Sequence, residues 1–551
     1  MRKRPLPSPI RKVARIRDKR TGSYLEIIEF PVSLEEIATI ELPPSVIADA
    51  SSFERRLRDA GAILPKRDLR DHLKSVAARK APKDLAYEAQ TGWNEDRKTF
   101  VFPEGAIGQS ASRVLGVNTG STAANGKLTK AGTWQSWRSS IGQAVRSSSI
   151  LMCGACTAFA APLLSVAGLQ SFTICLVGPS RSGKSVTSLV AGSVIGIGKA
   201  SDFITWNITD AHLEQRLPSF NDSVCPIDDL MALRDQRDRD RYLRVQGLAY
   251  KLAQGWATGR HGSFAAGRGG VEASWRTIVL TSNEVSIRDL AENAGMERQR
   301  GETIRLIDLP AMHEGADHIF DRLGKKMSPE EMVNWRREAF REISLAAELN
   351  HGAVFQRYVK FLIARGGRLD IEVAREIERF CRKVRDKKDT DLSRDLAKRF
   401  GLLYAGGVFA RRGDLVRWGE DETFAAVKNC YLRARAFLPD DGETLRDGLD
   451  LLDKKLSALP VIENGQSKRA VVYETVSGVQ FMPEATYLIK RGAFDAIFRS
   501  RHQLRLVEEW LLANERMTKA ISKRTQVRHI AKEQFIWPDG QRRRSLKLRL
   551  R

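Results

Sequence analysis

Residues 178–185 read GPSRSGKS and fit the pattern G-x-x-x-x-G-K-[ST], which is typical of loops that bind nucleoside triphosphates. An apolar run at 171–177 predicts a strand that enters the loop, and residues 186–194 predict a helix that leaves it. In that setting we expect Lys184 to pair with the β- and γ-phosphates and Ser185 to ligate Mg²⁺. The residues expected to hold ATP are Gly178, Pro179, Ser180, Arg181, Ser182, Gly183, Lys184 and Ser185.

Two adjacent carboxylates follow the next predicted strand. Residues 223–229 read SVCPIDD, a short apolar run that ends in Asp228 and Asp229. We expect Asp228 to hold Mg²⁺ through its water shell and Asp229 to orient or deprotonate the attacking water. Most such ATPases use Glu as the base, and Asp229 is one methylene shorter, so slow hydrolysis or a shared role for Glu284 stays open. The alternative is an acidic turn without a catalytic role.

Polar residues also end a third predicted strand, at residues 275–280 (WRTIVL). A side chain at that place can reach the γ-phosphate or the attacking water. Asn283 is the first candidate for this contact and Ser282 the second. An ordinary polar turn is the alternative.

Three arginines precede a further apolar run at residues 306–309: Arg298, Arg300 and Arg305. An arginine offered to the ATP of a neighbouring subunit would stabilise the charge that develops during phosphoryl transfer. Arg305 is the best candidate of the three. A site completed in this way requires a homo-oligomer.

The elements that must position these residues follow the pattern of an α/β core. Between residues 134 and 310, apolar strands alternate with helical segments, which is typical of a mostly parallel sheet flanked by helices. Short strand patterns and one helical stretch at 52–80 come before it. Helical periodicity and then a basic terminal hairpin come after it. The expected domains are 1–115 (α+β), 116–133 (a linker rich in Gly, Ser, Thr and Asn), 134–310 (the P-loop core), 311–487 (helical) and 488–551 (basic).

The charge of the chain favours a polyanionic partner. Its formal net charge is +24 and its sequence pI about 9.9, which suits nucleic acid or an anionic membrane surface. No secretory signal is visible, and the six scattered cysteines favour a reducing compartment. We therefore expect a cytoplasmic protein.

One uncharged run calls for a membrane test. Residues 150–169 are long enough to span a bilayer, but Pro162 and many small residues favour a buried helix, so no membrane partner is expected. Cys153 and Cys156 form a C-x-x-C within this run. With no second pair and no nearby His, small core residues are favoured over a zinc or redox site.

Two basic segments are candidate DNA contacts. Residues 255–273 form a glycine-rich stretch that carries Arg260, Arg268 and two aromatic residues, which suits a single strand and its bases. A loop that is simply long is the alternative. Near the C-terminus, cations beside the predicted hairpin would grip duplex phosphates without reading bases. These are Arg542, Arg543 and Arg544.

Together these features resemble the family catalogued as domain of unknown function 927, whose members look like replicative helicases of phages, plasmids and other mobile elements. The likeness covers most of the chain. Its residues here are Gly92 with Trp93, the loop 178–185, Trp206 with Thr209, Asn221 with Asp222 before IDD, WRTIVLTSNE at 275–284, IRLIDLP at 304–310, His351 with Gly352, and RFGLLYAGG at 399–407. Asp229 in place of Glu, and SNE in place of a commoner S-T-G-E string, depart from the family pattern and bear on the hydrolysis rate.

The resemblance implies an AAA+ or RecA-like core in a homo-oligomeric ring, a hexamer, with Arg305 at the family's arginine position. It also implies a C-terminal winged helix, where we expect duplex to bind. The loop 255–273 is where we expect single-stranded DNA in the pore, and a separately encoded primase is a possible partner. The expected function is that of an ATP-dependent DNA helicase or translocase of a mobile genetic element. An ATP-switched DNA-binding regulatory or assembly protein is the alternative that Asp229 keeps open. A membrane-associated ATPase rests on residues 150–169 alone.

Overall fold

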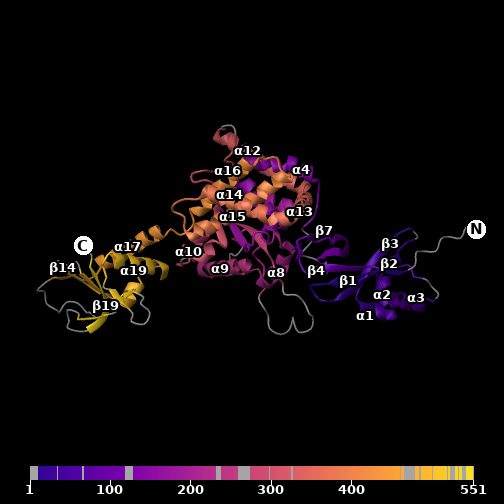
Figure 1. Cartoon of the computed structure of the whole chain (residues 1–551), viewed down its shortest axis with the longest axis horizontal. Coiled ribbons are helices and arrows are strands. Elements are labelled where there is room, and N and C mark those ends of the chain that lie inside the picture. Colours follow the sequence, from indigo (N-terminus) through magenta and orange to yellow (C-terminus); the bar gives the residue numbers. More distant parts are fainter. Residues whose placement is uncertain are drawn as a thin grey trace, which may run out of the picture. The chain divides into compact units, whose positions relative to one another are not determined.

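The chain forms two compact units, seen in the computed structural model drawn in Figure 1. Unit 1 comprises Met1–Leu290 and Gly301–Ala436, and unit 2 comprises Ala291–Arg300 and Phe437–Arg551. The structure describes residues 10–33, 35–64, 68–117, 128–230, 237–257, 273–296, 298–323, 327–459, 461–463, 478–482, 486–498, 501–517, 519–521, 528–530, 533–536 and 542–549.

Unit 1 begins with an α+β domain built on a five-stranded sheet of order β3-β2-β1-β4-β8. Its strands are β1 (Arg11–Asp18), β2 (Tyr24–Pro31), β3 (Ile37–Leu42), β4 (Asp84–Glu88) and β8 (Val114–Val117). Helices α1 (Pro44–Ala48), α2 (Ala50–Asp59) and α3 (Leu69–Ala78) pack on this sheet through a cluster that includes Ile28, Phe30, Phe53, Leu57 and Leu73. The single helical stretch expected at 52–80 is therefore two helices. Asp49 starts α2 by accepting a hydrogen bond from Ser52 N.

A four-stranded parallel sheet forms the centre of unit 1, in the order β10-β11-β9-β12. Its strands are β9 (Phe172–Val177), β10 (Ser223–Pro226), β11 (Thr277–Asn283) and β12 (Leu306–Pro310). Almost every strand residue is buried, as expected for a parallel sheet covered on both faces. The chain is thus a mixed α/β protein with a central parallel sheet, and the strands expected at 171–177 and 223–229 are confirmed as β9 and β10.

The third predicted strand, at 275–280, differs from the observed β11. The strand continues to Asn283 because its ladder with β9 runs from Ile278 opposite Phe172 to Asn283 opposite Val177. Ser282 and Asn283 therefore form the end of the strand and are buried, where the sequence placed them just after it, with a polar turn as the alternative. Parallel pairing overrides the polar character of these residues.

Helix α6 (Ser149–Ala160) accounts for most of the uncharged run. All of its residues are buried, and it packs against α7 (Lys184–Ile195), α15 (Asp391–Arg412) and α16 (Glu420–Arg435). The approach is close, because a Cβ on Gly406 of α15 would lie 2.6 Å from the backbone N of Ala160. The small residues of the run permit this packing, and the predicted buried helix is confirmed as far as Ala160, whereas residues 165–169 lie beyond it and are partly exposed. Among the helices that the structure describes, none combines the length and apolar character needed to cross a bilayer.

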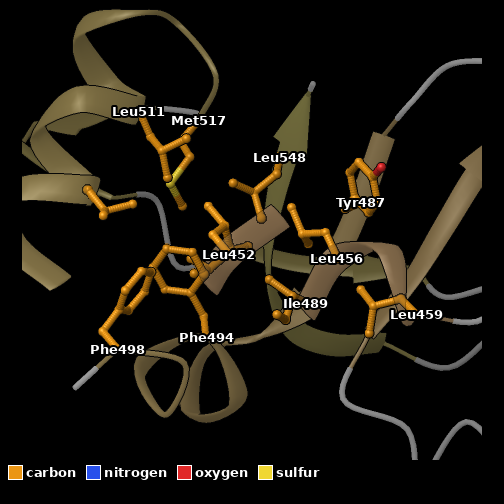
Figure 2. Packing of buried hydrophobic residues seen from close by; sticks show 12 residues of the cluster. Leu452, Leu456, Leu459, Tyr487, Ile489, Phe494, Phe498, Leu511, Met517 and Leu548 are labelled. Atoms are coloured by element: carbon orange, nitrogen blue, oxygen red, sulfur yellow. The ribbon is translucent and has the colours of Figure 1, made fainter. Parts of the chain in front are cut away.

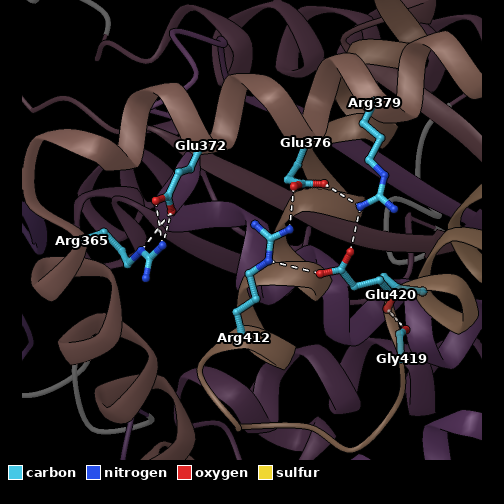
Figure 3. Close-up of polar contacts among 8 residues, drawn as sticks. Arg365, Glu372, Glu376, Arg379, Arg412, Gly419 and Glu420 are labelled. Atoms are coloured by element: carbon cyan, nitrogen blue, oxygen red, sulfur yellow. Dashed lines mark hydrogen bonds and ion pairs between the residues drawn. The ribbon is translucent and has the colours of Figure 1, made fainter.

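Five helices follow the sheet and complete unit 1. These are α12 (Pro329–Leu349), α13 (Ala353–Arg365), α14 (Leu369–Val384), α15 and α16. Figure 3 shows a closed ring of ion pairs that joins three of them. Arg412 of α15 contacts Glu376 at 2.6 Å and Glu420 at 3.2 Å, while Arg379 contacts Glu420 at 2.8 Å and Glu376 at 3.4 Å. The Glu376 side chain is only 4% exposed, so its charge depends on these two arginines.

The segment expected as a linker, 116–133, is held at both of its described ends. Gly116 and Val117 belong to β8, which pairs with β4. At the other end, Thr129 N donates to the carbonyl of Gly196 at 2.8 Å, and the Thr129 hydroxyl shares a 2.8 Å hydrogen bond with Nε2 of His351. Residues 118–127 lie outside the described residues.

Unit 2 contains a five-stranded sheet of order β13-β14-β15-β19-β18. Its strands are β13 (Val461–Glu463), β14 (Gly478–Met482), β15 (Thr486–Lys490), β18 (Glu533–Ile536) and β19 (Arg542–Arg549). Figure 2 shows its core, where Leu452 and Leu456 of α17 (Asp441–Ser457) meet Ile489, Phe494 and Leu548. The terminal hairpin is confirmed as β18 and β19. The helical region expected up to residue 487 instead ends with α17, because β13, β14 and β15 join this sheet.

Candidate nucleotide-binding site

The loop 178–185 connects the carboxyl end of β9 to α7, which begins at Lys184. Gly183 caps this helix with a φ of 103°, in the left-handed region that favours glycine. A Cβ at this position would lie 2.6 Å from Cδ1 of Ile319 and 2.8 Å from Cζ of Phe340. Gly183 is therefore favoured both by its left-handed backbone conformation and by the close packing of Ile319 and Phe340, which follow the sheet in the chain.

Lys184 lies inside the loop with little exposure. Its Nζ donates to the carbonyls of Gly178 at 2.6 Å and Pro179 at 2.9 Å. Burial lowers the pKa of Lys184, whereas the charges of Asp229 and Glu284 act in the opposite direction. Both carboxylates therefore lie within electrostatic range of the loop lysine, although they come from different strands. Ser185, the expected Mg²⁺ ligand, is exposed in the first turn of α7.

A chain of hydrogen bonds fixes the backbone at the acidic pair. Asp228 N donates to the carbonyl of Ile204 at 2.7 Å. The Asp228 carbonyl accepts from the Thr281 hydroxyl at 2.9 Å, and that hydroxyl in turn accepts from Nε1 of Trp206 at 2.8 Å. The Asp228 side chain is exposed and Asp229 is half-buried, so both can meet a ligand. Trp206 and Thr281 are positioning residues to which the sequence assigned no role.

Asn283 brings an unsatisfied polar group to the same edge of the sheet. Its side chain is buried, and its Oδ1 has no hydrogen-bond partner among the described residues. Ser182 Oγ, within the loop, is also buried and without a partner there. The Asn283 carbonyl accepts from Gly178 N at 3.2 Å, so strand β11 and the loop are joined directly. Buried polar atoms normally have partners, and two orphans at one edge fit a polar ligand such as a triphosphate with its cation.

Arg305 lies at the opposite edge of the sheet. It directly precedes β12, whose Leu306 pairs with Thr173 near the start of β9, whereas the loop follows the end of β9. At a rise of about 3.3 Å per strand residue, some 16 Å of sheet separates Arg305 from the loop. Arg305 therefore cannot serve the loop of its own chain. Its Nη1 donates to the carbonyl of Gly301 at 2.6 Å, and its Cζ lies 5.1 Å from the ring centroid of Tyr250.

A second arginine, Arg399 of α15, lies near Arg305. It is buried, its Nη1 donates to the carbonyl of Asp395 at 3.1 Å, and its Nε has no partner among the described residues. Burial lowers the pKa of Arg399 and the charge of Arg305 lowers it further. The sequence placed Arg399 in a family motif without a role.

Four motif residues form a clamp between the central sheet and the hairpin of β5 (Gly92–Trp93) and β6 (Thr99–Val101). Trp93 N donates to Oδ2 of Asp222 at 3.0 Å, and Nδ2 of Asn221 donates to the carbonyl of Thr91 at 2.8 Å. Gly92 has a φ of 98°, and a Cβ there would lie 2.5 Å from both of these side chains. Burial raises the pKa of Asp222 to about 6. The role of Gly92, Trp93, Asn221 and Asp222 is therefore to join two parts of unit 1.

The candidate DNA-binding residues are only partly described. Arg260 and Arg268 lie outside the described residues, which resume at residue 273. Trp256, at the described end of that segment, is 62% exposed. The C-terminal cations belong to strand β19, whose backbone there lies opposite Ile536, Phe535 and Gln534 of β18 in the antiparallel ladder. These cations are Arg542, Arg543 and Arg544.

Comparison with known proteins gives one match to a family model and one similarity of fold. Residues 3–269 match the model of the family described as "Domain of unknown function (DUF927)". No curated protein matches the sequence. Among solved structures, "SCCmec type IV Cch - active helicase" is similar with a TM-score of 0.66 and 16% identity, covering 99% of this chain and 94% of that one. "The A form apo structure of NrS-1 C terminal region-CTR(305-718)" gives a TM-score of 0.29 at 10% identity, with 95% and 96% covered. The first of these likenesses extends over nearly the whole chain and shows a shared fold.

Proposed function

Because residues 3–269 match the DUF927 family model, we propose that the protein is an ATP-driven DNA helicase or translocase of a mobile genetic element. One observation carries the proposal: Lys184, Asp229, Glu284 and the unsatisfied Asn283 meet at the edge of the sheet where the loop 178–185 begins. The fold shared with a protein named an active helicase supports the choice of activity.

The chain's own residues suit Mg-ATP at this edge. ATP bound there would supply the phosphoanhydride bond whose hydrolysis releases free energy. Lys184 would neutralise phosphate charge, and Ser185 with Asp228 would hold the Mg²⁺. Asp229 would accept a proton from the attacking water, with Asn283 orienting that water and Glu284 available to share the task. Trp206 and Thr281 would keep the backbone of Asp228 in place during each cycle.

The position of Arg305 supports a site shared between copies. An arginine on the far edge of the sheet can stabilise transition-state charge only at the loop of another subunit. Copies arranged head to tail in a closed ring, a hexamer in our proposal, would place each Arg305 at a neighbour's loop. Hydrolysis in one subunit would then depend on contact with the next.

DNA is the proposed partner because of the charge of the chain. A formal net charge of +24 favours a polyanion, and salt-dependent phosphate contacts follow from it. We assign the single strand in the pore to Arg260 and Arg268, and duplex to Arg542, Arg543 and Arg544 on β19, acting as a winged-helix-like region. A separately encoded primase and a cytoplasmic location complete the proposal.

Substitution of the loop lysine tests the motor. Lys184→Ala should lower DNA-stimulated ATP hydrolysis by at least about a hundredfold while DNA binding stays nearly unchanged, since the lost ammonium would act on the ATP phosphates and not on DNA. Lys199→Ala removes an exposed lysine that is paired with Glu348 and serves as the matched control. Wild-type hydrolysis that ignores every nucleic acid would refute the motor.

One observation favours a second candidate, an ATP-switched DNA-binding regulatory or assembly protein. Asp229 is shorter than the Glu usual at this position, which suits a protein that holds ATP longer than it spends it. Strand displacement on a forked duplex, with ATP and with a non-hydrolysable analogue, separates the two candidates. Displacement with ATP alone supports the helicase, and absence of displacement in both supports the switch.

A further inference from the structure

An open pocket lies on the five-stranded sheet of the N-terminal domain. Its volume is about 350 Å³, and its lining includes Arg15, Arg17, Tyr24, Asp84, Ala86 and Arg113. Arg15 and Arg17 are exposed and alternate along β1 with buried residues, so both side chains stand on one face of the sheet. The strand register places Tyr24 opposite Arg17 and Asp84 opposite Arg15. The pocket is thus built by three adjacent strands and the turn that precedes β8.

The cations of this pocket differ from most of the cations near them in having no ion-pair partner among the described residues. Arg15, Arg17 and Arg113 form no ion pair with any residue that the structure describes, and Asp84 is the one carboxylate in the lining. Three of the other cations on β1 and the turn after it are neutralised across strands. Those pairs are Arg11 with Glu29, Lys12 with Glu26 and Lys19 with Glu88. Three arginines against one acid leave the pocket with surplus positive charge.

An aromatic ring accompanies these charges. Tyr24 is 39% exposed, and Cζ of Arg15 lies 4.2 Å from the centroid of its ring. Stacking by a guanidinium restricts the ring without covering it completely. Proteins that bind single strands use the same combination. Arginines bind the phosphates, and a neighbouring aromatic ring stacks on a base. The volume lies within the range of about 300–1,000 Å³ that small-ligand sites occupy and is near its lower end, as suits one nucleotide.

We propose that this pocket binds a nucleotide unit of single-stranded nucleic acid, with phosphates on Arg15, Arg17 and Arg113 and a base against Tyr24. It is a DNA contact separate from the two that the proposed function names. It rests on the proposed function in taking DNA as the strand, but it requires neither ATP nor hydrolysis. A free nucleotide offers the same chemistry, so the test includes both sources.

The experiment measures binding of fluorescein-labelled oligo(dT) to the full chain without ATP, over a series of salt concentrations. Arg15→Ala, Arg17→Ala and Arg113→Ala together should weaken binding at least about tenfold and reduce the slope of log K against log[salt] by about 2, at ~0.7 per phosphate contact. A matched control removes three arginines from helices α2 and α3 of the same domain. These are Arg55, Arg56 and Arg70, which are exposed.

Tyr24 provides an independent variant that leaves the charge intact. Tyr24→Leu should weaken oligo(dT) binding severalfold with an unchanged salt slope, and Tyr24→Phe should restore it, because stacking needs the ring and not the hydroxyl. Wild-type binding that equals that of the triple variant overturns the proposal, as does an equal loss in the control triple. Binding of dTMP that is lost in the triple variant, with oligo(dT) binding unchanged, also overturns it and assigns the pocket to free nucleotides. Hydrolysis measured separately shows whether the motor fails, so the two failures are distinguishable.

Discussion

Replacing Asp222 by Asn should make the protein more stable at neutral pH and have little effect in acid. Asp222 lies in the clamp and is only 3% exposed. Burial raises the pKa of its carboxyl from an ordinary 3.8 to about 6. Because the folded-state pKa is raised, the stability that the protonated carboxyl contributes to the fold is fully present below pH 3.8. That contribution is lost as the pH rises from 3.8 through 6, because the unfolded chain releases the proton first.

The magnitude follows from the shift. A difference of about 2.2 pKa units corresponds to about 3 kcal/mol of folding free energy lost once both states are ionised. Asn keeps an oxygen that can accept the hydrogen bond from Trp93 N and carries no charge. At pH 7.5 the variant should therefore exceed the wild type by up to about 3 kcal/mol, and at pH 4 the gap should shrink to about 0.5 kcal/mol.

Urea unfolding followed by tryptophan fluorescence at pH 4, 5, 6 and 7.5 measures this difference. Asp59→Asn, at an exposed carboxylate at the end of α2, is the control and should give a gap that does not change between pH 5 and 7.5. If the Asp222 variant is less stable than the wild type at pH 7.5, the ionised carboxylate is favourable in the fold, and burial in the clamp does not raise its pKa.

Two further substitutions test the elements that position the site. Trp206→Phe keeps an aromatic ring but removes the indole N–H that donates to Thr281 Oγ1, so kcat for ATP hydrolysis should fall about tenfold with KM for ATP nearly unchanged. Steady-state kinetics that show the reverse pattern would contradict the positioning role. Glu376→Gln removes one of the two carboxylates that Arg379 and Arg412 share, and it should lower the free energy of unfolding by about 2 kcal/mol. The expected loss is smaller than for a fully buried ion pair because both arginines are about one-third exposed. Urea unfolding measures it, and an effect below about 0.5 kcal/mol would show that Glu420 alone suffices.

Local pattern was enough to predict the strands and the loop that carry Lys184. The G-x-x-x-x-G-K-S spacing, the apolar run before it and the helix after it are all encoded within about twenty-five residues. The same holds for the two acids after β10. Where pairing with a distant strand decided the structure, the expected bounds were wrong. Strand β11 continues past its expected end at residue 280 to Asn283, and the strands of unit 2 lie in a region expected to be helical.

Contacts between distant residues explain what the sequence could not reveal. The hydrogen bond from Trp206 to Thr281 joins residues 75 apart, and that from Trp93 to Asp222 joins residues 129 apart. Neither pair has a spacing that periodicity or motif spacing can detect. The resemblance singles out Gly92, Trp93, Asn221 and Asp222, but only the fold shows that they form one clamp.

The order of the central sheet makes the nucleotide loop a late product of folding. Strand β9 has hydrogen-bonded neighbours on both sides, β11 and β12, and the nearer of these in sequence starts at Thr277, a hundred residues after β9 ends at Val177. Pairings between such distant segments form slowly, since a long stretch of chain must close first. During synthesis the loop therefore emerges from the ribosome long before its supporting strands exist. A nascent chain that stops before Pro310 lacks the sheet that shapes the loop, and it should have no competent site for a nucleotide.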